Sequence, residues 1–572
     1  MLSLGYTAAV AIAAQPDAGT LLNQEQRSQQ RFPGRLPETE RQPARPALRD
    51  AGGARVVIKS VRFTGAVDLA TESELQGIVA KALGQELDFA GLEQLARSVT
   101  EFLRGKGWFL SEAYLPKQDV TDGNIEISIR AGRLDGKENK GEPFVIVPGG
   151  KLEARIDSAR LRAIAAGLLP AGAPADESEI ERAILLMNDL PGISARARLE
   201  PGIEEGSAHV VIDFEEGPLL SGAVGLDNYG NHDTGVNQAN AAVRINDLSG
   251  NGDQAGVAAT HADGLDYARI SYALPVGSAG AKLGANLSSM QYKIMSGSGQ
   301  SAGLKGSADT AGLTLSYPFR RSRANNLYGT LGYTSKALKD DSAAGLLHDK
   351  RVGVWNATLS GDRLDGTYGG GFTFWNVGWT EGRLDLSRLP SDAAYDAAGY
   401  DTQGGYGKLS YGLARLQKLL GPLALFANFS GQTAGKNLDS SEKFILGGPN
   451  GVRAYPGSEA SGDSGWLANV EVRYDLPGTG LGPLQLIAFY DTGSIKLHDD
   501  TKDIAIATYS QQNSYRLSGW GLGLNLSKTG SYALRLAWAQ KIGDNPGRTT
   551  NGLDADGHAD RSRAWLQATW WL

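Results

Sequence analysis

The chain has 572 residues and a formal net charge of -7 at pH 7, and it contains no cysteine. The acidic balance argues against nucleic acid as a partner, and the lack of cysteine excludes disulfides, thiolate nucleophiles and cysteine-based metal sites. No run of about 18 apolar residues follows the N-terminus, so no transmembrane helix is predicted. A transmembrane β-barrel would escape this test, because only every second residue of its strands is apolar.

The N-terminal segment has the composition of a secretory signal. Residues 1–14 are rich in alanine and end in Ala11-Ile12-Ala13-Ala14, which is typical of a signal-peptide cleavage site. No Lys or Arg precedes this stretch, which indicates either a truncated signal or a true start further upstream. The alternative is an unstructured Ala-rich tail.

A short helix and a linker follow. Residues 15–32 are polar and predict a weakly amphipathic helix, with Asp17 as its N-cap and Leu21 and Leu22 as its only large aliphatic residues. Residues 33–54 contain four prolines among many charges and predict an extended linker. A helix on a long tether could plug another part of the molecule, whereas the alternative is a disordered polar tail.

Two small α+β units come next. Residues 55–135 predict the order strand, helix, helix, strand, strand, because apolar residues recur at helical spacing over 92–103 and alternate in the flanking segments. Residues 143–217 repeat this order, with helices expected over 158–168 and 176–190. Two tandem copies of one small fold predict an interaction array, whose sheet edges could accept an extended peptide by strand addition. The alternative is a pair of spacer domains without a ligand.

The remaining residues, 219–572, predict an all-β barrel. Segments of roughly 10–14 residues alternate in polarity and are separated by turns, which is typical of a transmembrane barrel. About sixteen strands are predicted, beginning near Leu219, Asn240, Gln254, Leu265, Ala279, Ala308, Leu327, Val352, Tyr368, Tyr406, Pro422, Gly465, Pro483, Tyr515, Gly530 and Arg563. Short turns alternate with long loops at 435–464, 496–513 and 543–562, which fits an outer-membrane barrel. The alternative is a soluble β-sandwich, which would hold fewer and shorter strands.

The alternation also predicts which side chains face the lumen. A charge on the lipid face costs about 2–4 kcal/mol at the membrane midplane, so Arg535 is expected inside the barrel. The same argument places Glu471 on one strand, and Phe489 and Asp491 on the next, toward the lumen. The Trp- and Leu-rich end of the chain is expected to close the barrel as its last strand.

One loop carries a single arginine in an unusual setting. Residues 446–466 contain six glycines and two prolines around Arg453. Arg453 can reach Asp491, and also Glu471, only if the loop folds back into the barrel. A bidentate arginine–carboxylate pair inside a pore would act as an oriented latch. The alternative is an arginine in solvent, as is usual for this residue type.

This loop resembles the signature loop of two-partner secretion transporters, the haemolysin secretion/activation proteins of the ShlB, FhaC and HecB type. The loop residues that carry the resemblance are Gly447, Gly448, Val452, Tyr455, Gly462 and Gly465. Phe489 and Gly493 flank Asp491 in a stretch that resembles the family's second motif. The family usually has a glycine after the motif's arginine; Ala454 stands here, and alanine has less freedom for a positive φ.

The resemblance implies a plug helix in 15–32, two periplasmic polypeptide-transport-associated (POTRA) domains in 55–135 and 143–217, and a 16-stranded transmembrane barrel with an inward-folded extracellular loop. Asn188 to Gly192 resembles the helix end of the family's second POTRA domain. It also implies a monomeric pore, surrounded by outer-membrane lipid of a Gram-negative bacterium. This pore would recognise an unfolded exoprotein through its POTRA domains and secrete it without nucleotide hydrolysis.

Two points stay open at this stage. The exoprotein could be an adhesin, a haemolysin, a toxin or a haem-scavenging protein. A barrel-assembly factor of the same superfamily is the alternative function. A diffusion porin is disfavoured, because porins lack repeats such as those in 55–217.

Other motifs do not support an enzyme. Residues 462–465, Gly-Asp-Ser-Gly, copy a serine-protease motif, but a triad also needs a positioned histidine and aspartate. The six histidines, at 209, 232, 261, 348, 498 and 558, are scattered, and no pair has metal-ligand spacing. Residues 519–523 contain three glycines, which are expected to place small residues in the lumen rather than to bind a nucleotide. No catalytic activity, cofactor or metal is therefore expected.

Overall fold

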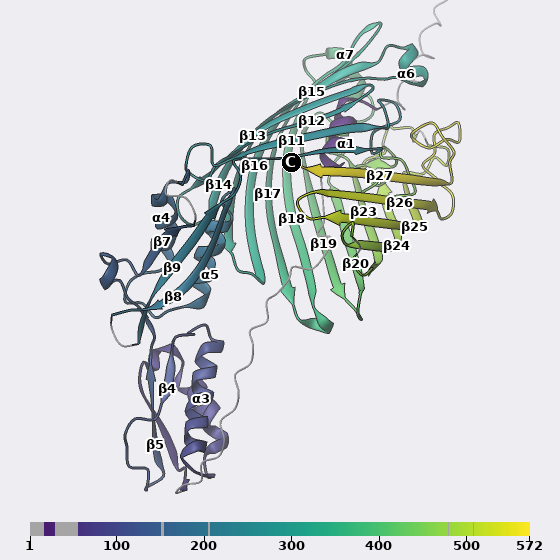
Figure 1. Ribbon diagram of the computed structural model, residues 1–572. Helices are drawn as coiled ribbons and strands as arrows, with labels where there is room; N and C mark the ends of the chain where they lie inside the picture. The colour runs from purple at the N-terminus through teal and green to yellow at the C-terminus, as the bar shows by residue number, and fades with distance from the viewer. Residues whose placement is uncertain (1–15, 29–54, 150–153, 204–205, 479, 507) are drawn as a thin grey trace, which may run out of the picture.

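A helix, two α+β units and a closed β-barrel follow one another along the chain (Figure 1). The computed structural model describes residues 16–28, 55–149, 154–203, 206–478, 480–506 and 508–572. The signal-like residues 1–14 and the expected linker 33–54 lie outside the described residues. No helix within the described ranges is long and apolar enough to cross a membrane.

The first α+β unit packs two helices against a three-stranded sheet of order β2-β5-β4. Its elements are β1 (Val56–Val57), β2 (Ser60–Gly65), α2 (Glu72–Val79), β3 (Glu86–Leu87), α3 (Phe89–Gly105), β4 (Glu112–Tyr114) and β5 (Asn124–Arg130). Thr71 and Glu74 form a capping box at the start of α2, and Asp88 caps α3. The apolar stripe of α3 faces the sheet and builds the core of the unit.

The second α+β unit repeats this order and is built on a longer sheet. Its elements are β6 (Arg133–Leu134), β7 (Phe144–Pro148), α4 (Ser158–Leu168), α5 (Glu177–Asn188), β8 (Ile193–Pro201) and β9 (Ser207–Glu216). Strand β9 is central: it pairs in parallel with β6 and β7 and antiparallel with β8. Asp157 and Asp176 cap the two helices through their carboxylates.

The barrel closes with sixteen antiparallel strands, which confirms the predicted fold class. The strands are β10 (Leu220–Asp227), β11 (Gln238–Asn246), β12 (Gln254–Ala262), β13 (Leu265–Val276), β14 (Ala281–Lys293), β15 (Lys305–Arg320), β16 (Asn325–Ser342), β17 (Gly345–Asp365), β18 (Gly371–Asp385), β19 (Gly404–Lys418), β20 (Leu423–Ala434), β23 (Ser464–Asp475), β24 (Leu484–Lys496), β25 (Ser514–Lys528), β26 (Tyr532–Lys541) and β27 (Ser562–Trp571). The largest error in the predicted strand starts is at β17, which begins at Gly345 rather than near Val352.

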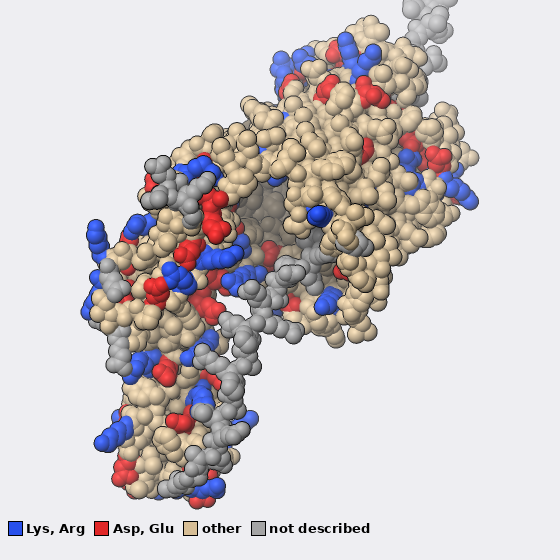
Figure 2. Space-filling model, viewed as in Figure 1, with Lys and Arg blue, Asp and Glu red and all other residues tan. Residues whose placement is uncertain are grey.

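The predicted alternation of side chains is present in the wall. In β24, Leu486 and Tyr490 point outward and are exposed, whereas Phe489 and Asp491 point into the lumen and are buried. Figure 2 shows that charged side chains gather on the two α+β units and on the loops at the opposite end, while the barrel wall between them is almost free of charge. This uncharged wall is the surface expected to meet lipid.

The second α+β unit is docked against the barrel turns. Arg321, between β15 and β16, donates from Nε and Nη2 to the two carboxylate oxygens of Asp189, both at 2.9 Å. Lys282 Nζ on β14 donates to the Asp189 carbonyl at 2.6 Å. Asp189 follows the last residue of α5, so the C-terminal end of this helix is fixed at the mouth of the barrel.

Candidate functional site

The long loop between β20 and β23 returns into the barrel. It contains a short helical turn, η5 (Ser440–Glu442), and a two-stranded sheet of β21 (Phe444–Ile445) and β22 (Ser461–Gly462). This small sheet forms the neck of the loop, and residues 446–460 project beyond it into the lumen. We call residues 446–460 the inner loop.

The inner loop is held in shape by its own backbone. Leu446 N donates to Ala460 O, and Gly447 N donates to Glu459 O, each at 3.0 Å. Gly448 adopts a φ of 103°, which glycine accepts at little cost. The loop therefore arrives in the lumen as a compact, hydrogen-bonded unit.

Arg453 binds two carboxylates on the barrel wall. Its Nε donates to Asp491 Oδ2 at 2.8 Å, and its Nη2 donates to Asp491 Oδ1 at 2.7 Å, which makes a bidentate pair. Its Nη1 donates to Glu471 Oε1 at 2.8 Å, and its backbone N donates to Asp491 Oδ2 at 3.1 Å. Asp491 is fully buried and Glu471 is nearly so. The structure thus brings together all three residues of the expected latch.

Neighbouring side chains complete this charge cluster. The Arg453 guanidinium carbon lies 3.4 Å from the centre of the Phe489 ring, in a cation–π contact. Asn469 Nδ2 donates to Asp491 Oδ1 at 2.8 Å, and Arg473 Nε donates to the second oxygen of Glu471 at 2.8 Å. Each buried carboxylate therefore has a cationic partner, which is what burial of a charge requires.

A contact that the sequence did not suggest reaches Arg453 from the last strand. Trp565 on β27 donates from Nε1 to the Arg453 carbonyl at 2.8 Å. Through Arg453 the inner loop is thus bonded to β23, β24 and β27. No sequence signal linked Trp565 to the loop.

Small residues make room for the loop. A Cβ at Gly493 would lie 2.3 Å from Leu446 Cδ1, and one at Gly462 would lie 2.4 Å from the Lys496 carbonyl oxygen. At Gly447 a Cβ would lie 2.3 Å from the Pro456 carbonyl oxygen, and at Gly465 2.7 Å from that of Ser494. These motif glycines therefore allow close approach between backbones, and a side chain at any of them would displace its neighbour.

The remaining motif residues pack in the barrel, and the Tyr455 ring also lies 5.0 Å from Lys541 Nζ in a cation–π contact. Val452 and Tyr455 are fully buried in a cluster that includes Leu446 and Leu517 of β25. Ala454, where a glycine was expected, does not adopt a positive φ, so alanine causes no backbone strain there. The substitution is therefore compatible with the loop conformation.

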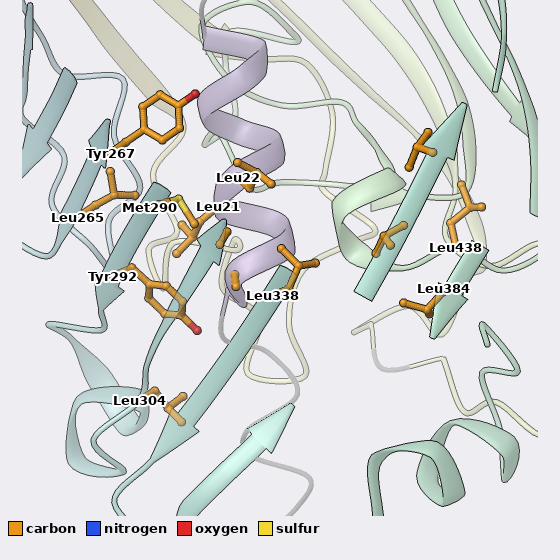
Figure 3. Close-up of a cluster of buried hydrophobic side chains, with 14 of the residues drawn as sticks. Leu21, Leu22, Leu265, Tyr267, Met290, Tyr292, Leu304, Leu338, Leu384 and Leu438 are labelled. Atoms are coloured by element: carbon orange, nitrogen blue, oxygen red, sulfur yellow. The ribbon is translucent and has the colours of Figure 1, made fainter. Parts of the chain in front are cut away.

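The N-terminal helix α1 (Ala18–Ser28) lies inside the barrel (Figures 1 and 3). Leu21 and Leu22 are fully buried, and their cluster includes Met290 and Leu338 on the wall. Within the segment 15–32, where a helix was predicted, the structure describes a helix over Ala18–Ser28, and residues 29–32 lie outside the described residues.

Polar contacts fix the start of α1. Asp17 caps the helix, because Thr20 N donates to its Oδ1 at 2.9 Å. Its other oxygen accepts from Ser440 Oγ at 2.6 Å and from Lys350 Nζ at 3.3 Å, and Lys350 also donates to Asp439 at 2.9 Å. Burial opposes ionisation of Asp17, but Lys350 and these hydrogen bonds hold its pKa below the usual value. The helix start is therefore tied to the wall and to the long loop together.

The other end of α1 meets the inner loop. Arg27 donates from Nη1 to the Ile445 carbonyl, and Asn450 Nδ2 donates to the Arg27 carbonyl at 3.2 Å. Asn23 Nδ2 donates to the Lys443 carbonyl at 2.7 Å. Both α1 and the inner loop therefore block the lumen, and hydrogen bonds join them to each other.

An open part of the lumen remains beside these two blocks. A cavity of about 880 Å³ is lined by α1, the inner loop and the wall. Arg453 and Glu471 reach it, as do Asn23 of α1 and Asn525 of β25. Arg535 also lines the cavity, which places it in the lumen as predicted.

The protease-like motif has structural partners instead. Asp463 Oδ1 pairs with Lys443 Nζ at 3.0 Å, and its Oδ2 accepts from Asp499 N at 2.8 Å. Ser464 Oγ accepts from Ala434 N at 3.0 Å. Both residues therefore stabilise the neck of the long loop.

The chain matches the family model of the haemolysin secretion/activation protein ShlB/FhaC/HecB over residues 206–526, which is more than half of its length. The chain belongs to this family. Residues 56–132 match the model of the ShlB-type POTRA domain. The first α+β unit is accordingly a periplasmic POTRA unit, and the barrel is that of an outer-membrane transporter.

Several characterised relatives cover most of the chain. A heme/hemopexin transporter protein, HuxB, of Haemophilus influenzae is 26% identical over 499 residues, which are 86% of this chain and 83% of the relative. The outer membrane transporter CdiB of Dickeya dadantii is 22% identical, over 80% of this chain and 79% of the relative. The solved structure of CdiB from Escherichia coli superposes with a TM-score of 0.69 at 19% identity and covers 100% of this chain and 99% of that chain. CdiB from Acinetobacter baumannii gives 0.63 at 18%, with 96% of both chains covered.

Proposed function

We propose that this family member secretes a large exoprotein across the outer membrane, takes it up unfolded through its two POTRA units, and uses no nucleotide hydrolysis. The observation that carries the proposal is the double block of the lumen by α1 and the inner loop. Both blocks are held to the barrel by hydrogen bonds, ion pairs and packing, all of which can break and re-form. A polypeptide could therefore pass once both have moved.

Free strand edges support uptake of an unfolded chain. In the first POTRA unit β2 and β4 are the outer strands of the sheet, and in the second β8 pairs only with β9. An extended peptide can add to such an edge through its backbone, whereas a folded protein offers few free backbone groups. Recognition by strand addition therefore fits an unfolded cargo.

The latch gives the inner loop a defined resting position. Arg453 neutralises two buried carboxylates at once, so breaking its contacts leaves charges that need water or new partners. The loop would thus stay in place until a polypeptide competes for the lumen and admits water. In this proposal the latch orients the loop at rest and opens during transport.

The driving force for transport is proposed to come from folding of the exoprotein outside the cell. The sequence holds no G-x-x-x-x-G-K-[ST] motif for a nucleotide phosphate. Folding outside would prevent the cargo from sliding back. We further propose that the barrel works as a monomer with its uncharged wall in lipid.

The relatives suggest where to look for the cargo. HuxB is named for heme and hemopexin, and this chain is similar to it over most of its length. Among adhesins, haemolysins, toxins and haem-scavenging proteins, we therefore propose the haem-scavenging type as the first cargo to test.

The test is secretion by cells that carry the chain together with a large exoprotein encoded beside its gene. Wild type should release the exoprotein into the medium, whereas Arg453→Ala and Asp491→Ala should reduce release at least tenfold. Arg516→Ala is the matched control, because Arg516 is an exposed arginine on the neighbouring strand β25. A difference in gel migration between unheated and heated samples of each variant would establish that its barrel is folded.

Two outcomes would count against the proposal. Normal release by both latch variants would show that secretion does not need the Arg453–Asp491 pair. If wild type released no exoprotein but restored barrel insertion to cells depleted of their assembly factor, the barrel-assembly alternative would replace secretion.

A further inference from the structure

Two histidines from opposite ends of the barrel sequence meet at its extracellular rim. His232 lies in the loop after β10, and His558 lies in the loop before β27. Their Nε2 atoms are 3.0 Å apart, and the two rings are nearly perpendicular, at 83°. The sequence showed no histidine pair with metal-ligand spacing, because barrel closure alone brings these two positions together.

The pair stands above the seam where the first barrel strand meets the last. Strands β10 and β27 pair only over Ala223–Asp227 and Gln567–Trp571, which is the shortest ladder in the barrel. Asn228 extends the ladder by one step, since its backbone N donates to the Leu566 carbonyl at 3.2 Å. Asn228 Nδ2 also donates to the Ala564 carbonyl at 2.9 Å, and the histidines join the two loops that diverge from the seam.

The geometry of the two nitrogens suits a metal ion. At a typical metal–nitrogen distance of about 2.1 Å, a separation of 3.0 Å gives a nitrogen–metal–nitrogen angle of about 90°. This angle is that of neighbouring positions in the octahedral or tetragonal coordination that Ni²⁺ and Cu²⁺ favour. A direct hydrogen bond between the rings uses the same distance, but then one ring must donate and the other accept.

Carboxylates lie near both histidines. The Nδ1 atom of His232 faces Asp233 Oδ1 at 3.8 Å, and Asp233 is itself fixed by Ser296 Oγ at 2.5 Å. His558 N donates to Asp556 Oδ1 at 3.2 Å, and Asp556 also pairs with Arg563 of β27. For His232, the carboxylate near Nδ1 favours the tautomer that keeps a lone pair on Nε2, which is the usual arrangement around a metal-bound histidine.

The site is open to solvent. His558 is exposed and His232 is about one-third exposed. Within the described ranges no group of three or more histidine, cysteine, aspartate or glutamate side chains converges on one point. A metal held here would have two protein ligands and would fill its remaining positions with water, so it could exchange with the medium.

We propose that His232 and His558 bind one divalent transition-metal ion of the Ni²⁺ or Cu²⁺ class through their Nε2 atoms. The bound ion joins loops 228–237 and 542–561 above the seam. It adds a link between β10 and β27 beyond their short ladder, and so stabilises the closed barrel at the extracellular rim.

The binding test uses the full chain, refolded in detergent without an affinity tag and titrated with Cu²⁺. Wild type should bind one equivalent, with an electron paramagnetic resonance spectrum that reports two nitrogen ligands. His232→Ala and His558→Ala should each weaken binding at least tenfold and lose the two-nitrogen pattern. His261→Ala is the matched control, because His261 is a well-exposed histidine on the same rim, at β12.

The outcomes separate binding from its effect on the seam. Unchanged binding in either loop variant, or no two-nitrogen spectrum in wild type, would overturn the site. With Ni²⁺ added, amide exchange in 228–237 and 556–561 should slow in wild type but not in His558→Ala. Equal exchange with and without Ni²⁺ in wild type would overturn the link across the seam.

Discussion

Ala454 of the inner loop packs against Gly519 of β25. A Cβ built on Gly519 would lie 2.6 Å from the Ala454 Cβ, so Gly519→Ala should force the loop away from the wall. Overpacking of this kind costs about 1–3 kcal/mol, and the additional change Ala454→Gly should restore most of it. The measurement is the midpoint of heat unfolding, followed by the gel migration of the barrel.

Gly523 provides the control for this pair. Gly523 lies on the same strand and the same face as Gly519. A Cβ at Gly523 would lie 3.2 Å from a backbone oxygen, and one at Gly519 would lie 3.1 Å from such an oxygen, so the two sites are equally close to the wall. Unlike Gly519, Gly523 has no contact with the inner loop. Gly523→Ala should therefore be destabilised less than Gly519→Ala and should gain nothing from Ala454→Gly. An equal gain in both backgrounds would mean that the loop does not press on Gly519.

Glu459 makes the inner loop sensitive to pH. It is almost fully buried and accepts from Asn545 Nδ2 at 2.9 Å and Ala555 N at 2.8 Å. Burial, with a smaller contribution from Asp554, raises its pKa to about 7, although these hydrogen bonds and Lys541 favour the charged form. The folded protein thus holds a proton that the unfolded chain releases near its ordinary pKa of 4.5.

The sign of the effect follows from this proton. Between pH 4.5 and 7 the folded state binds more protons than the unfolded state, so the free energy of unfolding falls as pH rises and stays at its lower level above pH 7. The loss is at most about 3 kcal/mol. In Glu459→Gln the midpoint temperature of unfolding should depend less on pH between pH 5 and 8 than it does in wild type. A wild-type midpoint that rises over this range would contradict the prediction.

The sequence predicts a site residue best where a motif or the alternation of side chains along a strand singles that residue out. Arg453, Asp491 and Glu471 were named because alternation placed the two acids on the lumen face and the loop composition singled out the arginine. The contacts of Trp565 and Gly519 could not be predicted, because they depend on how strands far apart in sequence are staggered around the barrel. The meeting of His232 and His558 depends on closure in the same way.

At the scale of elements, α1 is the block that single substitutions should remove most readily. Leu22 is fully buried between the helix and the wall. Leu22→Asp would bury a charge without a partner, at a cost of several kcal/mol, and should drive the helix out of the lumen. We expect the conductance of single barrels in planar lipid bilayers to rise severalfold.

A substitution at an exposed position one turn further along α1 tests whether burial is the cause. Gln26 is exposed, so Gln26→Asp adds the same charge where water can solvate it. This variant should keep the wild-type conductance. If Leu22→Asp conducted no better than Gln26→Asp, α1 would not be the block that limits ion flow.

The elements themselves were predictable to different degrees. Turns and alternation locate the strands, but they predict too late a start for β17, because His348 to Arg351 place polar side chains on both of its faces. The position of α1 could not be derived, because Leu21 and Leu22 show that the helix buries something but not which wall it meets. Docking of α1 needs the barrel to exist first.

At the scale of the whole molecule, one ion pair sets how the second α+β unit faces the barrel. Asp189 and Arg321 are partly buried and bidentate, and Lys282 holds the same residue by its carbonyl. Hydrogen bonds to charged groups of this kind contribute roughly 1.5–3 kcal/mol each, so losing them should free the unit to swing. Under the proposed function, cargo bound at its sheet edges would then reach the mouth less often.

The prediction is that Asp189→Ala broadens the distance distribution between spin labels on α4 and on the β17–β18 turn, and reduces secretion severalfold while leaving the conductance of the plugged barrel unchanged. Arg321→Lys should have a smaller effect, since lysine keeps the charge but loses the bidentate geometry. Asp213→Ala is the control, because Asp213 pairs with Arg198 inside the same unit and does not contribute to this docking contact. A narrow distribution in Asp189→Ala would show that packing alone fixes the unit, and the loss of secretion would then have to arise from the pair's effect on the turns of the barrel.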